Sequence, residues 1–213
     1  MESLDELLEQ AKVAHGHLCA GQILGVRMAV LGCKRLGIDE PRGKDRKRLV
    51  TYIEIDRCAT DAIGVVTGCR LGKRALKFRD WGKMAATFVD LGTGRALRVV
   101  ALESSRQRAR ELYPEIADKN QQQMKAYSEL PDEDLFGEQW VAVDVTPNEM
   151  PGYRGQRVVC AQCGEGVNYG RFVERGDERL CLACAHPEER YYRPAAGEAG
   201  QSGFAMESRC ECG

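Results

Sequence analysis

Four cysteines in the C-terminal part of the sequence constrain the fold of this chain more than any other feature. Cys160 and Cys163 form one pair with two residues between them, Cys181 and Cys184 form a second, and 17 residues separate the pairs. Two thiolates at positions i and i+3 of a tight turn hold one side of a tetrahedral ion, and a hairpin brings the second pair to the other side. The segment has too few apolar residues for a core of its own. The spacing therefore predicts a closed, structural zinc site that stabilises a small module and leaves no position open for catalysis.

The cysteine content of the whole chain also indicates metal or thiol chemistry. The 213 residues include 10 cysteines, and the sequence is 43% hydrophobic and 30% charged, enough for a sizeable core. Residues 1–6 are acidic and carry no cationic leader, and no run of 18 apolar residues occurs. We therefore expect a cytoplasmic protein without a membrane span, in which cysteines bind metal or stay reduced instead of forming disulfides.

Apolar periodicity and turn residues predict an α+β fold. The sheet is expected to be mixed or antiparallel with helices packed on it, followed by a small zinc ribbon. Thr60 is expected to cap one of the helices, and Gly68 to end it. The predicted domains are 1–150 (metal binding), 151–187 (ribbon) and 188–213 (a flexible, cysteine-terminated tail). Expected helices cover 4–13, 23–36, 60–67, 103–112 and 115–128, and expected strands cover 49–56, 75–79, 83–90, 95–101 and 140–145.

A second group of metal-ligand residues lies near the N-terminus. His15, His17 and Cys19 fall within five residues, in a loop that contains Gly16 and feeds the glycine-rich second helix. Cys19 lies near the start of that helix, where the helix dipole favours a thiolate. The alternative is two hydrogen-bonded histidines beside a structural cysteine.

Two further cysteines flank the short helix expected at 60–67. Cys58 is at its N-terminal end, a position expected to lower a thiol pKa, and Cys69 follows its C-terminal end. Eight helical residues span about 12 Å, too far for both thiolates to bind one ion with Zn–S bonds near 2.3 Å. One of them can join Cys19, and Cys58 is favoured, which leaves Cys69 as a nearby or buried thiol. Asp61, in the first helical turn, is either a dipole partner or a proton-transfer group.

Charge is distributed unevenly along the sequence. Residues 42–110 contain 17 Lys/Arg and 7 Asp/Glu, whereas residues 111–150 contain 2 Lys/Arg and 10 Asp/Glu. Solvated faces that pair with each other explain this pattern, and a small anionic ligand is the alternative if the cations following the second cysteine motif lie beside Cys19 and Cys58. Those cations are Arg70, Lys73, Arg74 and Lys77.

The two cysteine motifs together resemble one family. The segments HGHLCAG (15–21) and DRCATDAIGVVTGCRLG (56–72), with the trailing four-cysteine ribbon, are similar to the FmdE family of formylmethanofuran dehydrogenase proteins as far as about residue 185. Ala20 stands where the family usually has proline, a change that removes no ligand. The resemblance implies an α+β metal-binding domain followed by a zinc ribbon, commonly as a homodimer. It also implies these metal or active-site residues: His15, His17, Cys19, Cys58 and Cys69.

Three functions follow as hypotheses. The first is a metal-binding accessory protein that supports molybdenum or tungsten oxidoreductases or handles metal, with zinc or another divalent transition metal on His17, Cys19 and Cys58. An open fourth position would let Cys69, His15, water or a substrate complete that site. The second is a metal-dependent enzyme acting on a small anionic substrate, with His15 or Asp61 moving a proton. The third is a ribbon-based regulator of nucleic acid or polymerase, for which the mixed charges of the ribbon give little support.

The chain also ends in Cys210 and Cys212, which could capture a soft metal or form a redox pair.

Overall fold

The computed structural model describes residues 1–193 as two compact units. The first comprises residues 1–145 together with 150–152, and the second comprises, among the described residues, 146–149 and 153–193. Cys210 and Cys212 lie outside the described residues. Among the residues described, every helix is too short or too polar to cross a lipid bilayer.

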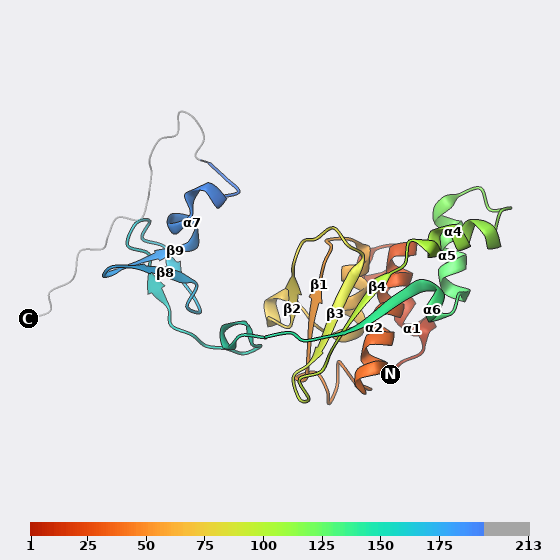
Figure 1. Ribbon diagram of the computed structural model, residues 1–213, viewed down its shortest axis with the longest axis horizontal. Coiled ribbons are helices and arrows are strands. Elements are labelled where there is room, and N and C mark those ends of the chain that lie inside the picture. Colours follow the sequence, from red (N-terminus) through yellow and green to blue (C-terminus); the bar gives the residue numbers. More distant parts are fainter. Residues whose placement is uncertain (194–213) are drawn as a thin grey trace, which may run out of the picture. The chain divides into compact units, whose positions relative to one another are not determined.

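A five-stranded mixed sheet with helices packed against it forms the first unit, which confirms the predicted fold class (Figure 1). The strand order is β2-β1-β3-β4-β5, with β1 and β2 parallel and all other neighbours antiparallel. The strands are β1 (Leu49–Ile53), β2 (Leu76–Phe78), β3 (Ala85–Asp90), β4 (Ala96–Ala101) and β5 (Phe136–Val141). The helices are α1 (Leu4–His15), α2 (Ala20–Leu36), α3 (Cys58–Thr67), the 3-10 turn η1 (Leu71–Lys73), α4 (Ser104–Leu112), α5 (Lys119–Glu129) and α6 (Asp132–Leu135).

The helix α2 is the centre of this unit and packs through its glycines, as the sequence predicted. A Cβ atom on Gly32 would lie 2.3 Å from a ring carbon of Phe88 in β3, so the aromatic ring rests directly on the helix backbone. A Cβ atom on Gly25 would lie 2.5 Å from the carbonyl oxygen of Ala59 in α3. The backbones of α2 and α3 therefore touch, and the starts of the two helices are held at a fixed separation.

Local sequence sets the limits of the helices. Ser3 and Glu6 form a reciprocal capping box at the start of α1, and Gly16 ends that helix with a left-handed φ of 97°. The predicted Thr60 cap is wrong: Arg57 occupies the N-cap position of α3 without a side-chain capping bond, and the Thr60 hydroxyl donates to the carbonyl of Ile55.

The last strand of the sheet starts earlier than predicted. The strand expected at 140–145 is β5 at Phe136–Val141, and the turn of helix that precedes it, α6, has no counterpart among the expected elements. Residues beyond the strand serve a different purpose, because Val143 and Val145 pack with Val50 and Val89 on the sheet. These apolar residues alternate with polar ones, as in a strand, which is why the sequence predicts a strand here. In the structure the segment packs on the sheet beyond the end of β5.

A buried carboxylate anchors the turn between β3 and β4. The Asp90 side chain is fully buried and accepts hydrogen bonds from Arg48 Nη2 (2.7 Å), the Gly92 amide (2.9 Å) and the Thr93 hydroxyl (2.9 Å). Burial alone would raise its pKa, but the Arg48, Gly92 and Thr93 hydrogen bonds outweigh that effect and lower the pKa below the usual aspartate value.

Acid is therefore expected to destabilise the first unit. A carboxyl group whose folded pKa is lowered stabilises the fold above its unfolded pKa, and this stabilisation is lost as the pH falls from about 4 through the folded pKa. We expect the urea midpoint of wild type to fall between pH 6 and pH 3, and Asp90→Asn to lower the midpoint at pH 6 and flatten its pH dependence. Asp144→Asn, at an exposed position, is the control and should leave the wild-type pH profile in place. An unchanged slope in Asp90→Asn would contradict the prediction.

Short strands and turns make up the second unit, within its described residues. Two hairpins, β6 with β7 and β8 with β9, are followed by one turn of helix. A 3-10 turn begins the unit and another ends its described part. The elements are η2 (Pro147–Glu149), β6 (Val158–Val159), β7 (Gly166–Val167), β8 (Phe172–Arg175), β9 (Glu178–Cys181), α7 (Leu182–Ala185) and η3 (Pro187–Glu189).

Candidate metal centre

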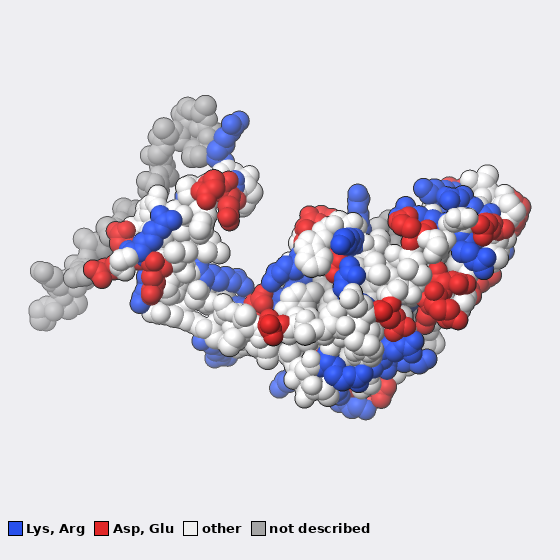
Figure 2. Space-filling view, viewed as in Figure 1, with Lys and Arg blue, Asp and Glu red and all other residues white. Residues whose placement is uncertain are grey.

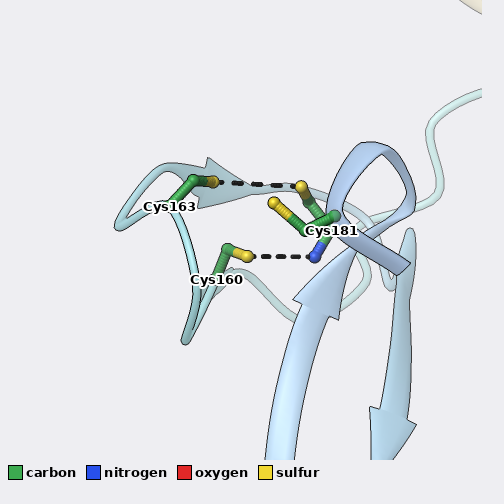
Figure 3. A group of neighbouring side chains, drawn as sticks. Cys160, Cys163 and Cys181 are labelled. Carbon is green, nitrogen blue, oxygen red and sulfur yellow. Dashed lines mark hydrogen bonds between the residues drawn. The ribbon is translucent and has the colours of Figure 1, made fainter. Parts of the chain in front are cut away.

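Four cysteine sulfurs converge in the second unit. The Sγ atoms of Cys160, Cys163, Cys181 and Cys184 all lie within 4.8 Å of one another, and those of Cys163 and Cys181 are 3.9 Å apart (Figure 3). Four sulfurs around one zinc ion with Zn–S bonds near 2.3 Å are separated by about 3.8 Å, so the cluster has nearly the size of a loaded site. The donor set fits zinc and is closed, because four thiolates complete a tetrahedron.

Backbone geometry positions these sulfurs. Cys160 follows β6, and the turn after it closes with a hydrogen bond from the Gly164 amide to the Cys160 carbonyl, Gly164 having a left-handed φ of 75°. Cys181 ends β9 and caps α7, and Cys184 lies inside that helix turn. The first pair is thus carried by the turn that joins β6 to β7, and the second by the end of the β8–β9 hairpin and the helix turn that follows it.

Burial and hydrogen bonding shift the pKa values of the cluster thiols in opposite directions. Burial opposes ionisation of Cys160, but amide donors from Cys163, Cys181 and Gln162 lower its pKa to about 6. Burial, with the neighbouring thiols, raises the pKa of Cys184 to about 12. Metal binding must therefore release protons from this cluster. Arg190 Nη2 donates to the Cys184 sulfur at 3.2 Å and offsets part of the negative charge of four thiolates.

The first unit holds a second convergence of metal-ligand side chains, at its N-terminal loop. One ligand atom from each of His15, His17 and Cys19 lies within 4.8 Å of the other two. His15 is the last residue of α1, His17 follows the left-handed Gly16, and Cys19 caps α2. The reversal at Gly16 turns the loop back and brings the histidine rings to 4.9 Å between centroids.

Helix α3 brings two more of the predicted residues to this loop. A Cβ atom on Gly21 would meet both the Cys58 Cβ (3.4 Å) and the Cys19 Sγ (3.8 Å), so the two cysteines flank the same glycine. Asp61 lies one turn into α3 and forms a hydrogen bond with His15. Its Oδ2 atom is 2.8 Å from Nδ1 of His15. With Nδ1 engaged, the Nε2 atom of His15 is the nitrogen left for a metal or for proton transfer.

The predicted low pKa of Cys58 is wrong for the metal-free chain. Burial raises the pKa of the Cys58 thiol, and the adjacent Cys19 thiol raises it further. At the start of α3, the helix dipole therefore lowers the thiol pKa by less than burial and the neighbouring sulfur raise it.

Cys69 lies apart from this group. It follows the C-terminal end of α3, is buried, and its sulfur lies 3.5 Å from both the Thr51 hydroxyl and the Leu49 carbonyl oxygen. Burial raises the pKa of its thiol. Cys58 is the first residue of α3, whereas Cys69 lies two residues beyond its last residue, Thr67. The structure thus brings together His15, His17, Cys19, Cys58 and Asp61 and leaves Cys69 in the core beneath β1.

Asn120 supports the same loop and was not found from the sequence. Its side-chain oxygen accepts a hydrogen bond from the Ala20 amide, at 3.3 Å, and so satisfies a free donor at the start of α2 beside Cys19. Asn120 belongs to α5 and is separated from Ala20 by 100 residues. No local pattern could have indicated it.

Comparisons with known proteins match the two units to different families. Residues 14–137 match the family model described as FmdE, molybdenum formylmethanofuran dehydrogenase operon, and residues 152–190 match the prokaryotic dksA/traR C4-type zinc finger. A probable S-adenosyl-L-methionine-binding protein of Archaeoglobus fulgidus is 32% identical over 206 residues, covering 85% of this chain. The chain spans about half the length of that relative, 53%.

A solved structure has the same fold. It is a tungsten formylmethanofuran dehydrogenase FmdE-like protein from Syntrophus aciditrophicus, with a TM-score of 0.60 and 24% identity over 89% of this chain and 95% of that one. The family model covers more than half of the sequence, including the loop and helix that carry His15, His17, Cys19 and Cys58. The chain belongs to the FmdE family.

Proposed function

We propose that this chain is a metal-binding accessory protein with two metal sites, a structural zinc site on the four ribbon cysteines and a transition-metal site on His15, His17, Cys19 and Cys58. The observation that carries the second site is the convergence of two imidazoles and one thiol within 4.8 Å, beside a second thiol. Mixed imidazole and thiolate ligands suit zinc and its divalent neighbours, such as cobalt, nickel and iron. His15 and Cys19 are half-buried and His17 is exposed, so the ligands are held yet reachable from solvent.

Metal content tests the N-terminal site directly. We expect wild type to contain about two metal ions per chain by elemental analysis, and Cys19→Ser/Cys58→Ser to contain about one, because only the ribbon keeps its ligands. Cys69→Ser is the matched control and is expected to keep both ions, since its sulfur lies in the core. Circular dichroism verifies that each variant is folded. Equal metal content in wild type and the double variant would refute the N-terminal site.

The Asp61 carboxylate is expected to act through His15. A carboxylate that holds the far nitrogen of a ligating histidine fixes its orientation and basicity, and losing it weakens metal binding about 10- to 100-fold. Asp61→Asn should therefore weaken cobalt(II) binding at the N-terminal site by that factor, measured from visible absorption during titration. Asp56→Asn, an exposed position on the same connection, makes the same charge change and should leave the affinity unchanged. Identical affinities for both variants would remove His15 from the ligand set.

The same variant separates the accessory role from an enzymatic one. In the enzymatic alternative, His15 paired with Asp61 moves a proton for a substrate bound at the metal, and Asp61→Asn would spare the metal while abolishing turnover. The observation that favours this alternative is the 2.8 Å contact between the two side chains. S-adenosyl-L-methionine, named for the Archaeoglobus relative, is the first small molecule to titrate against metal-loaded protein.

The proposed partner is a molybdenum- or tungsten-dependent formylmethanofuran dehydrogenase-type oxidoreductase, and metal handling is the alternative accessory role. The support is the operon named in the description of the matching family. We also propose a homodimer, as the family resemblance implies, and a cytoplasmic location, which is supported by the absence of disulfides among the eight described cysteines. Light scattering gives the oligomeric state, and binding of the purified oxidoreductase to immobilised protein, with and without the N-terminal metal, tests the partnership.

A further inference from the structure

A basic cavity opens at the end of α3 remote from the His/Cys loop. It has a volume of about 770 Å³, within the range of small-molecule sites. The cations lining it come from the loop before β1 and from the η1 turn after α3, and no acidic residue is among the described residues that line it. These cations are Arg42, Arg46, Lys47, Arg70 and Lys73. The sequence predicts that Arg70 and Lys73 could hold an anion beside Cys19 and Cys58, and the structure places them in this separate cavity.

Within the described part of the chain, four of the five cations lack a compensating charge. Arg42 is occupied, since it pairs with Glu2 and donates to the Gln10 side chain at 2.6 Å. In residues 1–193 the side chains of Arg46, Lys47, Arg70 and Lys73 take part in no ion pair, although neighbouring Arg48 and Lys44 are both paired with acids. At the end of the unit formed by α4 and α5, by contrast, cations and acids are intermixed on the surface (Figure 2). An uncompensated group of cations around a hollow concentrates positive potential there.

The end of α3 accounts for only a small part of this arrangement. The carbonyl end of a helix stabilises a nearby cation by about 0.3–1 kcal/mol, which explains one attracted residue but not cations from two separate loops. Arg42 also packs its stem on Gly68, whose Cβ would lie 3.0 Å from Arg42 Cγ and whose φ is +68°. The glycine that ends α3 thus lets a basic loop approach the helix end closely.

The rest of the lining is apolar. Four apolar residues are part of the lining. Pro41 and Ala75 are buried, and Leu91 and Met150 are half-buried. Cations beside an apolar wall match a ligand that joins phosphate groups to a ring or hydrocarbon portion. Arg side chains bind phosphate oxygens through paired N–H donors, and lysines contribute point charges.

We propose that this cavity binds a small phosphate-bearing molecule of the nucleotide class, with its phosphates on Arg46, Lys47, Arg70 and Lys73 and its apolar portion against Leu91 and Ala75. The proposed N-terminal metal site lies at the start of α3 and this cavity lies at its end. The proposal therefore does not depend on that metal site. No phosphate-binding loop motif is needed, because side chains from two loops supply the donors.

The test is calorimetric titration of the full-length protein with ATP, pyrophosphate and adenosine at fixed ionic strength. We expect saturable binding of ATP, weaker binding of pyrophosphate and none of adenosine. Arg70→Ala/Lys73→Ala should weaken ATP binding at least tenfold, and Arg46→Ala/Lys47→Ala should do the same. The control Lys34→Ala/Arg110→Ala removes two exposed helix cations away from the cavity and should change affinity less than twofold.

Three outcomes would overturn the proposal. The first is no saturable binding of ATP. The second is equal weakening by the cavity and control pairs, which would indicate diffuse attraction to the whole surface. The third is salt-sensitive binding of a single-stranded oligonucleotide that ATP does not displace, which would assign these cations to a nucleic-acid surface. All four substituted cavity residues are exposed, so each variant is expected to fold, and thermal unfolding verifies this.

Discussion

Loss of zinc is expected to unfold the second unit while the first unit stays intact. Within the described residues, the buried cluster of the second unit consists of Cys160, Leu180, Cys184 and Ala185, so two of these four core residues belong to the four-cysteine cluster. A structural zinc ion contributes about 10–16 kcal/mol to the folding of such modules, far more than this small apolar cluster can supply. Chelation, or the variant Cys160→Ser/Cys184→Ser, should therefore collapse amide dispersion for residues 153–193 in ¹H–¹⁵N spectra while signals from residues 1–145 remain.

A neighbouring exposed position supplies the control for this result. Gln162 lies between the two cysteines of the first pair, its side chain is exposed, and it offers the cluster only its backbone amide. Gln162→Ser should therefore keep zinc and the folded spectrum. Retention of dispersed signals for residues 153–193 without metal would show that the hairpins fold on their own, and would contradict the structural role of the ion.

Removing Arg98 is expected to destabilise the first unit by about 3–5 kcal/mol. The Glu54 carboxylate is 4% exposed and is held by both Nε and Nη2 of Arg98 at 2.7 Å. Arg98→Met would leave that carboxylate buried without its partner, and burial of an unpaired charge is costly. Urea unfolding of the first unit, followed by circular dichroism, measures the loss.

The paired replacement separates charge from packing. Glu54→Met/Arg98→Met removes both ions together, and such replacements are close to neutral when the volume is filled. The double variant should therefore regain most of the stability lost in Arg98→Met. If the double variant is as unstable as the single one, packing or strand pairing at this position explains the loss instead. Glu54 directly follows β1 on the connection that leads to Cys58, so the same variants also report on the loop of the N-terminal site.

Much of the fold could be predicted because local signals are strong where the chain is amphipathic or punctuated by glycine. The capping box at Ser3, the stop at Gly68 and the close packing of α2 are all local consequences of sequence. The ribbon cysteines could be predicted from spacing alone, because a tetrahedral ion demands two turns of fixed geometry. The fold class followed from the same alternation of helical and strand-like periods.

The remaining differences depend on contacts between distant residues. β5 pairs with β4, and this pairing, which no short sequence window contains, places the strand at residues 136–141. The pKa of Cys58 is raised because tertiary packing buries it against Cys19. Arg70 and Lys73 follow the second cysteine motif in sequence, yet α3 carries them to the end opposite Cys58. Helix length was sufficient to predict that Cys58 and Cys69 are apart. It could not predict that the His15 side chain lies beside both Asp61 and His17.

The backbone contact at Gly25 has a consequence for how this family can vary. Because α2 meets α3 through a glycine, the separation of the helix starts that carry Cys19 and Cys58 is set by the main chain of Ala59 and by the small side chain of Ala62. Substitutions on faces of the two helices away from this contact can then accumulate without moving the sulfurs, whereas a side chain at position 25 or a larger one at position 62 would spread them. The alignment of the candidate ligands thus depends on small residues at the helix contact that bind nothing themselves.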